Sequence, residues 1–250
     1  MSVGTAFHPR TAPLNRKMQW REWSGYFASS VYADAHDIEY TAIREAAALI
    51  DVSPLYKYRV SGPDAERLVD RVIVRDASRL RVGQVYYTCW CDEHGKVIDD
   101  GTIHRLGDGE FRWTAADPQY RWLVLNADGL DVEIDDVTDT TAAVALQGPL
   151  SRAVLEAATG EDFSDLRYFR RRPATVKLSR RRLHIDVSRT HAHHIHEWEH
   201  GGATDISNTV LVCLKHHHAV HEGGWRITPT PGVDPHTSGC WTFTPPRTRP

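Results

Sequence analysis

The apolar and polar positions of the first 190 residues predict a mixture of short strands and short helices. Residues 39–50 carry apolar residues at helical spacing and predict a helix, whereas residues 55–62 alternate between apolar and polar positions, as a half-buried strand does. Because strands and helices do not alternate regularly, the pattern indicates an α+β domain. Further strands are predicted at residues 84–90, 96–103, 111–115, 130–134, 141–147 and 183–190, and further helices from Pro63, at 118–126 and at 150–158.

Turn residues refine this pattern. Asp92-Glu93-His94-Gly95 joins the strands at 84–90 and 96–103 and predicts a hairpin, with Gly95 in the left-handed conformation. The apolar strand at 141–147 is expected to be buried. Residues 1–37 lack a periodic pattern but are rich in aromatic side chains, so they predict an extended arm laid over a core rather than a disordered leader.

Histidines concentrate in residues 191–225, which hold nine of the fifteen in the chain. His193 and His194 stand side by side after a predicted strand, and His217 and His221 follow four residues apart. A four-residue step places two imidazoles on one face of a helix, as two ligands of one metal ion require. A third ligand from the doublet would leave coordination positions open for water and a phosphate oxygen, which is typical of a catalytic site.

The order of this segment, from the His doublet through a Gly-Gly loop and Asn208 to the H-x-x-x-H pair, resembles the HNH (ββα-metal) nuclease family. The resemblance implies that His193, His217 and His221 bind a divalent ion of the Mg, Zn, Ni or Mn class. It also implies that His194 is the general base and that Asn208 orients the loop. A neutral imidazole accepts a proton near pH 7, and a cation neutralises charge on a scissile phosphate. The implied activity is hydrolysis of DNA.

Two other interpretations of the His-rich segment stay open: a structural zinc site, and a surface tract that binds metal by accident. Many members of the HNH family carry a Cys pair ahead of the doublet for a structural zinc. Here no Cys lies between Cys91 and Cys213, so that zinc site cannot be assembled in the same way. The bacteriocin members of the family work without it, so catalysis remains compatible with the sequence.

Composition narrows the setting of the chain. With 250 residues, 41% hydrophobic and 25% charged, it fits one larger domain plus a small one in a soluble protein. Four unpatterned cysteines argue for a reducing compartment, and no segment suits a signal peptide or a membrane span, so we expect a cytoplasmic location and no membrane partner. The net charge of −3 gives no general attraction to nucleic acid, so DNA binding must depend on local patches.

Four segments of the first 190 residues carry a second resemblance. They are AALIDVSPLYKYRVSGPDA (47–65), GQVYYTCWCDEHGKVIDDGTIHRL (83–106), AVALQGP (143–149) and LHIDVSRT (183–190). In this order they resemble the N-terminal folate-binding domain of the glycine cleavage system T-protein (aminomethyltransferase) family. The resemblance implies tetrahydrofolate as a cofactor and transfer of a one-carbon unit, aminomethyl or methyl.

In that family an aspartate of the IDD segment contacts the pterin and positions the one-carbon unit. The resemblance therefore implies Asp99 as the first choice for this catalytic and folate-binding role and Asp100 as the second. Tyr87 and Trp113 are implied as walls of the pterin pocket. Without the resemblance, two adjacent aspartates after a hairpin would be interpreted as a turn or a solvated edge.

The second resemblance ends at Thr190. In the T-protein family SRT continues into a Gly-Tyr-Thr-Gly-Glu segment that also holds the folate, whereas here SRT runs straight into HAHHI. We therefore expect an incomplete T-protein-like domain at residues 1–190, an HNH module at 191–227 and an irregular Pro- and Thr-rich tail at 228–250. The alternative is a non-catalytic truncated fusion that binds metal or DNA without turnover.

Two charged stretches remain. The acidic residues of 128–139 are interpreted as a solvated edge. A basic run precedes the His-rich segment, and it is interpreted either as a solvated face or as a contact to the DNA backbone. Its members are Arg167, Arg170, Arg171, Arg172, Lys177, Arg180, Arg181 and Arg182.

Overall fold

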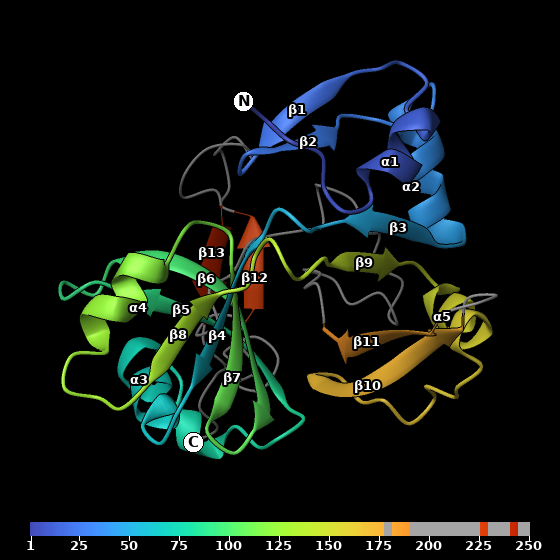
Figure 1. Ribbon diagram of the computed structural model, residues 1–250. Helices are drawn as coiled ribbons and strands as arrows, with labels where there is room; N and C mark the ends of the chain where they lie inside the picture. The colour runs from blue at the N-terminus through green and yellow to red at the C-terminus, as the bar shows by residue number, and fades with distance from the viewer. Residues whose placement is uncertain (178–181, 191–225, 230–240, 245–250) are drawn as a thin grey trace. The chain divides into compact units, whose positions relative to one another are not determined.

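Figure 1 shows the chain as a computed structural model, which describes residues 1–177, 182–190, 226–229 and 241–244. The chain divides into two compact units, Met1–Thr190 and His191–Pro250. Most of the described residues belong to the first unit, which contains all helices and strands from α1 to β11.

A five-stranded antiparallel sheet is the main element of the first unit. Its strands follow the order β5-β6-β7-β4-β8. Alternation of apolar and polar residues leaves one face of the sheet apolar and the other polar. The strands are β4 (Tyr56–Ser61), β5 (Val85–Cys91), β6 (Val97–Gly107), β7 (Glu110–Ala115) and β8 (Glu133–Asp136).

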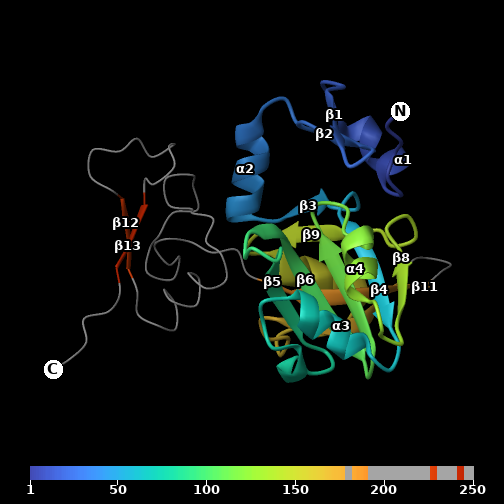
Figure 2. The same cartoon turned by 90° about the vertical axis from the view of Figure 1, so that its left-hand side faces the viewer.

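The apolar face is covered by two helices, α3 (Ala65–Val72) and α4 (Tyr120–Asn126). Figure 2 shows both helices in front of the sheet. Leu68 and Val69 of α3 are fully buried, as the sequence predicts, because residues one turn apart on this helix all face the sheet. Burying an aliphatic side chain of this size stabilises the fold by about 1.5–3 kcal/mol. This layer is the main hydrophobic core.

A hairpin of β10 (Arg170–Lys177) and β11 (Arg182–Arg189) lies on the other side of the sheet, behind it in Figure 2. Its first strand joins the edge of β5 through an antiparallel bridge between Gln84 and Arg170. The hairpin and α5 (Ser151–Thr159) enclose a smaller core around Phe163, Leu166 and Ala174. The hairpin therefore has one apolar side of its own and one side that faces the polar surface of the sheet.

The N-terminal residues are more regular than the predicted extended arm. They form α1 (His8–Thr11), the 3-10 turn η1 (Ala12–Leu14), a hairpin of β1 (Trp20–Trp23) and β2 (Tyr26–Ser29), and the start of α2 (His36–Glu45). The prediction of an irregular arm over residues 1–37 is therefore wrong. The short turn at Ser24 and Gly25, both with positive φ, lets the aromatic residues pair as a hairpin.

The predicted helix over residues 39–50 is also wrong in its second half. Helix α2 ends at Glu45, and β3 (Ala48–Asp51) pairs with β9 (Val144–Gln147). These residues have a helical pattern but are extended, because they form hydrogen bonds to a distant segment. The carbonyl oxygen of Ala46 accepts from the N–H of Leu150, and β3 pairs with β9. Such long-range contacts cannot be predicted from the local pattern.

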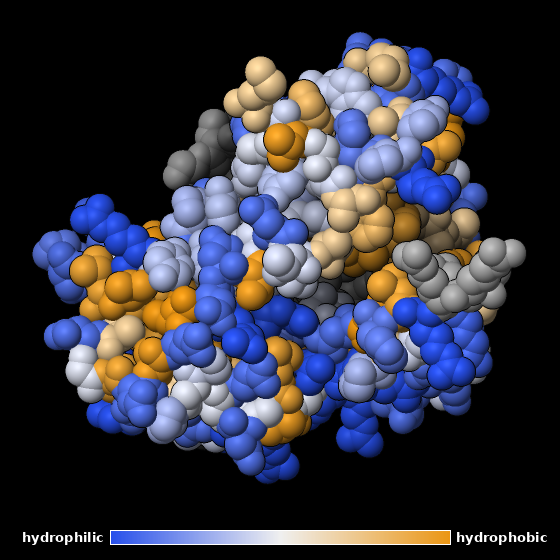
Figure 3. Space-filling view, in the orientation of Figure 1, coloured by the Kyte–Doolittle hydropathy of each residue, from blue (hydrophilic) through white to orange (hydrophobic). Residues whose placement is uncertain are grey.

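Three further predictions need correction. Strand β9 is half exposed rather than buried, because it pairs only with β3. Apolar side chains gather there in Figure 3, and Leu49, Ile50 and Val144 are exposed. The strand predicted at 130–134 is found at 133–136. Within the predicted irregular tail, residues 241–244 form β13 (Trp241–Thr244), which pairs with β12 (Arg226–Pro229).

Other predictions are confirmed. The hairpin β5–β6 turns at residues 92–95, and Gly95 has a φ of +76°. The acidic stretch after Asp128 includes β8, which is an edge strand of the sheet. The described residues form an α+β fold, as expected. Among the helices that the structure describes, none has both the length and the apolar character needed to cross a membrane.

Candidate functional site

Asp99 and Asp100 are neighbours on β6, but their side chains serve opposite faces of the sheet because side chains alternate along a strand. Asp99 shares its face with Ile103, which is fully buried in the core. Asp100 shares its face with Thr102 and His104. The two carboxylates therefore lie in different environments, one on the core side of the sheet and one on its polar face.

The Asp99 carboxylate accepts hydrogen bonds from the loop between β7 and α4. One oxygen accepts hydrogen bonds from the backbone N–H groups of Ala116 (3.1 Å) and Asp117 (3.0 Å), and a weaker one from the Gln119 amide (3.4 Å). The other oxygen accepts from the N–H of Asp100 (2.7 Å). A carboxylate with this many donors is held in place and orders the loop.

Asp100 and Tyr87 form a pair on the polar face. The Tyr87 hydroxyl donates a hydrogen bond to the exposed Asp100 carboxylate. Partial burial, and next the Asp100 carboxylate, raise the pKa of Tyr87 above its usual value. The phenol therefore stays protonated near neutral pH and keeps donating to Asp100. Tyr87 is 39% exposed, so a ring and a carboxylate are presented together to an incoming molecule.

Trp113, the second predicted pocket wall, lies on the other face. Its side chain is fully buried and packs edge to face with Trp90, with ring centroids 4.8 Å apart. The predicted site residues thus fall into two groups: Tyr87 with Asp100 on the polar face, and Asp99 with Trp113 on the core side. The structure does not bring the four together.

Sequence reasoning missed a charged cluster on the same polar face. The Arg112 guanidinium donates to Nδ1 of His104 (3.1 Å) and to the Asp186 carboxylate, which also accepts from Nε of Arg171 (2.7 Å). Burial lowers the pKa of His104 to about 3, so the ring is neutral and can accept. The cluster fastens the hairpin β10–β11 to the sheet. Its one signal in the sequence is an aspartate between two β-branched apolar residues, Ile185 and Val187, of a predicted strand.

A buried lysine was also missed. Lys57 is 2% exposed, and its ammonium donates to the carbonyl oxygens of Ser53 (2.8 Å) and Leu55 (2.6 Å). Burial lowers the pKa of Lys57 to about 8. Because both contacts hold the loop before β4, the position of Lys57 fits a structural role.

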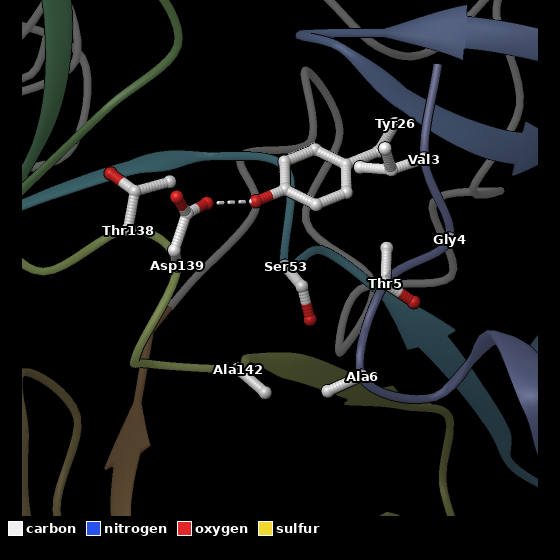
Figure 4. A pocket seen from close by; sticks show the side chains of 9 residues that line it. All are labelled: Val3, Gly4, Thr5, Ala6, Tyr26, Ser53, Thr138, Asp139 and Ala142. Carbon is white, nitrogen blue, oxygen red and sulfur yellow. Dashed lines mark hydrogen bonds between the residues drawn. The ribbon is translucent and has the colours of Figure 1, made fainter. Parts of the chain in front are cut away.

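A cavity of about 370 Å³ lies beside the N-terminal segment, and none of the predicted site residues lines it. Figure 4 shows the Tyr26 hydroxyl donating to the Asp139 carboxylate at its rim, and this hydrogen bond raises the pKa of Tyr26 to about 12. The lining residues are Val3, Gly4, Thr5, Ala6, Tyr26, Ser53, Thr138, Asp139 and Ala142.

The predicted nuclease residues His193, His194, Asn208, His217 and His221 lie outside the described residues, as do Arg180 and Arg181 of the basic run. Within the part of the chain that the structure describes, no group of three or more His, Cys, Asp or Glu side chains could hold a metal ion. The predicted metal site therefore stays a prediction.

Two family models match the chain. The model of the GCVT N-terminal domain matches residues 6–189, and the model of HNH endonuclease matches residues 180–223. The two matches share residues 180–189, and this shared range includes the whole of β11 (Arg182–Arg189).

The chain is also similar to individual proteins. The chain is 32% identical over 244 residues to the trimethylamine-oxide aldolase of Ruegeria pomeroyi, which covers 94% of this chain and 29% of that protein. It is 32% identical over 173 residues to the aminomethyltransferase of Lysinibacillus sphaericus, covering 64% of this chain and 47% of that protein. The chain therefore spans less than half the length of these relatives.

A solved structure supports the fold. The glycine cleavage system aminomethyltransferase T from Bartonella henselae superposes with a TM-score of 0.59 at 23% identity, covering 68% of this chain and 47% of that chain. At this level of identity the likeness concerns the fold alone.

Proposed function

Because this chain belongs to the GCVT N-terminal domain family and carries an HNH endonuclease match, we propose that it joins a folate-binding, one-carbon-transfer type of domain to a metal-dependent DNA nuclease module. The boundary is proposed at about residue 190, with the nuclease module at 191–227. The nuclease is the activity that we propose for the chain as it stands, since all five predicted HNH residues fall inside the matched range 180–223.

The folate half of the proposal is supported by the contact between Tyr87 and Asp100. A pterin offers a flat ring and several N–H donors, which match an exposed tyrosine ring and an exposed carboxylate. Asp99, whose oxygens already accept from the loop at residues 116–119, is better suited to positioning than to contact. We therefore place Asp100 ahead of Asp99 as the pterin ligand and Trp113 behind the site as core.

Binding of tetrahydrofolate tests the folate half. Titration of the whole protein should quench its tryptophan fluorescence with a saturable curve, because the core tryptophans lie directly behind strand β6. Calorimetry under the same conditions should give the same dissociation constant. Absence of heat and of quenching at high folate concentration would refute folate binding and leave the nuclease proposal untouched.

In the nuclease half, His194 would accept the proton of the attacking water. His193, His217 and His221 form a set of imidazole donors, which suits a divalent transition metal. When bound, the ion would neutralise charge on the scissile phosphate. Asn208 would orient the loop that carries the base. General-base help of this kind is typically worth about 10²–10⁴-fold in rate.

Cleavage of supercoiled plasmid tests the nuclease half. The protein should nick the plasmid when Mg²⁺, Mn²⁺, Ni²⁺ or Zn²⁺ is supplied, and a chelator should stop the reaction, because the imidazole set needs an ion to act on a phosphate. A protein that leaves the plasmid intact with each ion would support the alternative, a non-catalytic fusion that binds metal or DNA without turnover.

A further inference from the structure

The structure sorts the basic side chains around β10 and β11 into two groups. The first group has partners within the first unit: Arg171 binds Asp186 (2.7 Å), Arg172 binds Asp165 (3.4 Å), and Arg189 donates to the carbonyl oxygen of Leu166 (3.1 Å) and stacks on Tyr168. These side chains hold the hairpin together and are not available to a ligand without loss of a contact.

The second group consists of Arg167, Lys177 and Arg182, which are all exposed. Among the residues that the structure describes, no carboxylate forms an ion pair with any of them. We call these three residues the open cations. They carry three positive charges on one hairpin and the loop that leads into it.

Strand register concentrates two of these charges. Lys177 and Arg182 lie directly opposite each other in the antiparallel pair. Side chains in that position are about 5 Å apart at Cβ, and like charges there destabilise the pair. Arg167 precedes the other end of the hairpin, and the eight-residue strands place the two ends about 23 Å apart. The arrangement favours an extended polyanion over a single small anion.

We propose that the open cations bind the phosphate backbone of duplex DNA and hold it for the HNH module. The proposal rests on the nuclease function proposed above. It is carried by the juxtaposition of three exposed cations, which pair with no carboxylate among the described residues, with β11, which lies inside the range that the GCVT and HNH matches share. Because such contacts read charge and not bases, the binding has no sequence preference. A hairpin of the folate-type domain thereby serves the nuclease.

The test is the salt dependence of binding to a fluorescein-labelled duplex of random sequence, measured by anisotropy with EDTA present so that nothing is cut. The triple variant Arg167→Gln, Lys177→Gln, Arg182→Gln should bind about ten-fold more weakly at low salt. The slope of log affinity against log salt should fall by about 2 to 3, because each phosphate contact contributes about 0.9.

Two further variants serve as controls. Arg10→Gln, Lys17→Gln, Lys96→Gln removes three exposed charges elsewhere in the first unit and should bind like the wild type. Arg167→Lys, Lys177→Arg, Arg182→Lys keeps the charge and should retain the slope. A triple Gln variant with wild-type affinity and slope would overturn the proposal, as would a wild-type protein that does not bind the duplex.

Two outcomes distinguish failure of the nuclease function from failure of the DNA-binding surface. If plasmid stays intact with every divalent ion while the duplex binds through the open cations, the nuclease function is refuted and the DNA surface stands. If plasmid is cut and the triple Gln variant cuts and binds like the wild type, the nuclease stands and the surface is refuted.

Discussion

Asp99 and Asp100 are neighbours in the sequence, but their carboxylates have different hydrogen-bond partners. A family pattern identifies the IDD segment but does not say which carboxylate meets a ligand. The structure distinguishes them, because one side chain accepts three hydrogen bonds from residues 116–119 and the other is exposed and paired with Tyr87.

A pair of matched substitutions follows from this difference. Asp100→Asn should weaken tetrahydrofolate binding by about ten-fold or more, because a hydrogen bond to a charged group contributes about 1.5–3 kcal/mol. Asp99→Asn should mainly lower the melting temperature, since it loosens the loop between β7 and α4. Calorimetric titration and thermal melts of both variants measure this. A reversed result would restore Asp99 as the pterin ligand.

His104 gives the stability of the protein a pH dependence. Burial lowers its pKa to about 3, whereas in the unfolded chain it is near 6.5. Between these values the unfolded state binds the extra proton, so the folded state loses about 1.4 kcal/mol for each pH unit below 6.5. Urea denaturation of the wild type and of His104→Gln should therefore show a steeper acid loss in the wild type. Parallel curves would contradict the buried neutral imidazole.

At the scale of elements, Asp186 attaches the hairpin β10–β11 to the sheet through its ion pair with Arg112. Asp186→Asn leaves the guanidinium groups of Arg112 and Arg171, each at most 20% exposed, without their carboxylate, and should reduce the free energy of unfolding by about 3 kcal/mol. Asp165→Asn removes an exposed ion pair and should change it by less than about 1 kcal/mol. Urea melts compare the two, and equal losses would show that the hairpin is held by other contacts.

Gly101 keeps β6 and β7 in contact. A Cβ at this position would lie 1.9 Å from the carbonyl oxygen of Thr114, so Gly101→Ala should force the strands apart and reduce the free energy of unfolding by about 3 kcal/mol. Gly95→Ala has open space around it and only an unfavourable φ of +76°, so it should cost about 1 kcal/mol. Chemical denaturation gives both values. A larger loss at Gly95 would mean that the turn, not the strand contact, limits stability.

The success of sequence reasoning depended on how local the cause of each element is. The hairpin at residues 92–95 and helix α3 were predicted because turn chemistry and one apolar stripe suffice for them. Strand β3 was missed because its extended form comes from pairing with β9, about a hundred residues later. The Asp186 cluster was missed for the same reason, since its partners come from β7 and β10.

At the scale of the whole molecule, the chain belongs to the GCVT N-terminal domain family, and its HNH match begins at residue 180, just before β11. The family and the α+β class could be predicted from ordered segments of sequence, and both are confirmed. The metal ligands, the general base and the domain boundary at residue 190 stay predictions, because residues 191–225 lie outside the described residues.

The central claim is that His194 is the general base of a metal-dependent nuclease, and one comparison tests it most directly. Wild type and His194→Ala are given the same divalent ion, and plasmid nicking is measured beside metal uptake by calorimetry. We expect His194→Ala to lose at least about 10²-fold in nicking rate while binding the ion nearly as well, because the proposal makes His194 the base and not a ligand. Equal nicking rates, or loss of metal binding together with activity, would contradict the account.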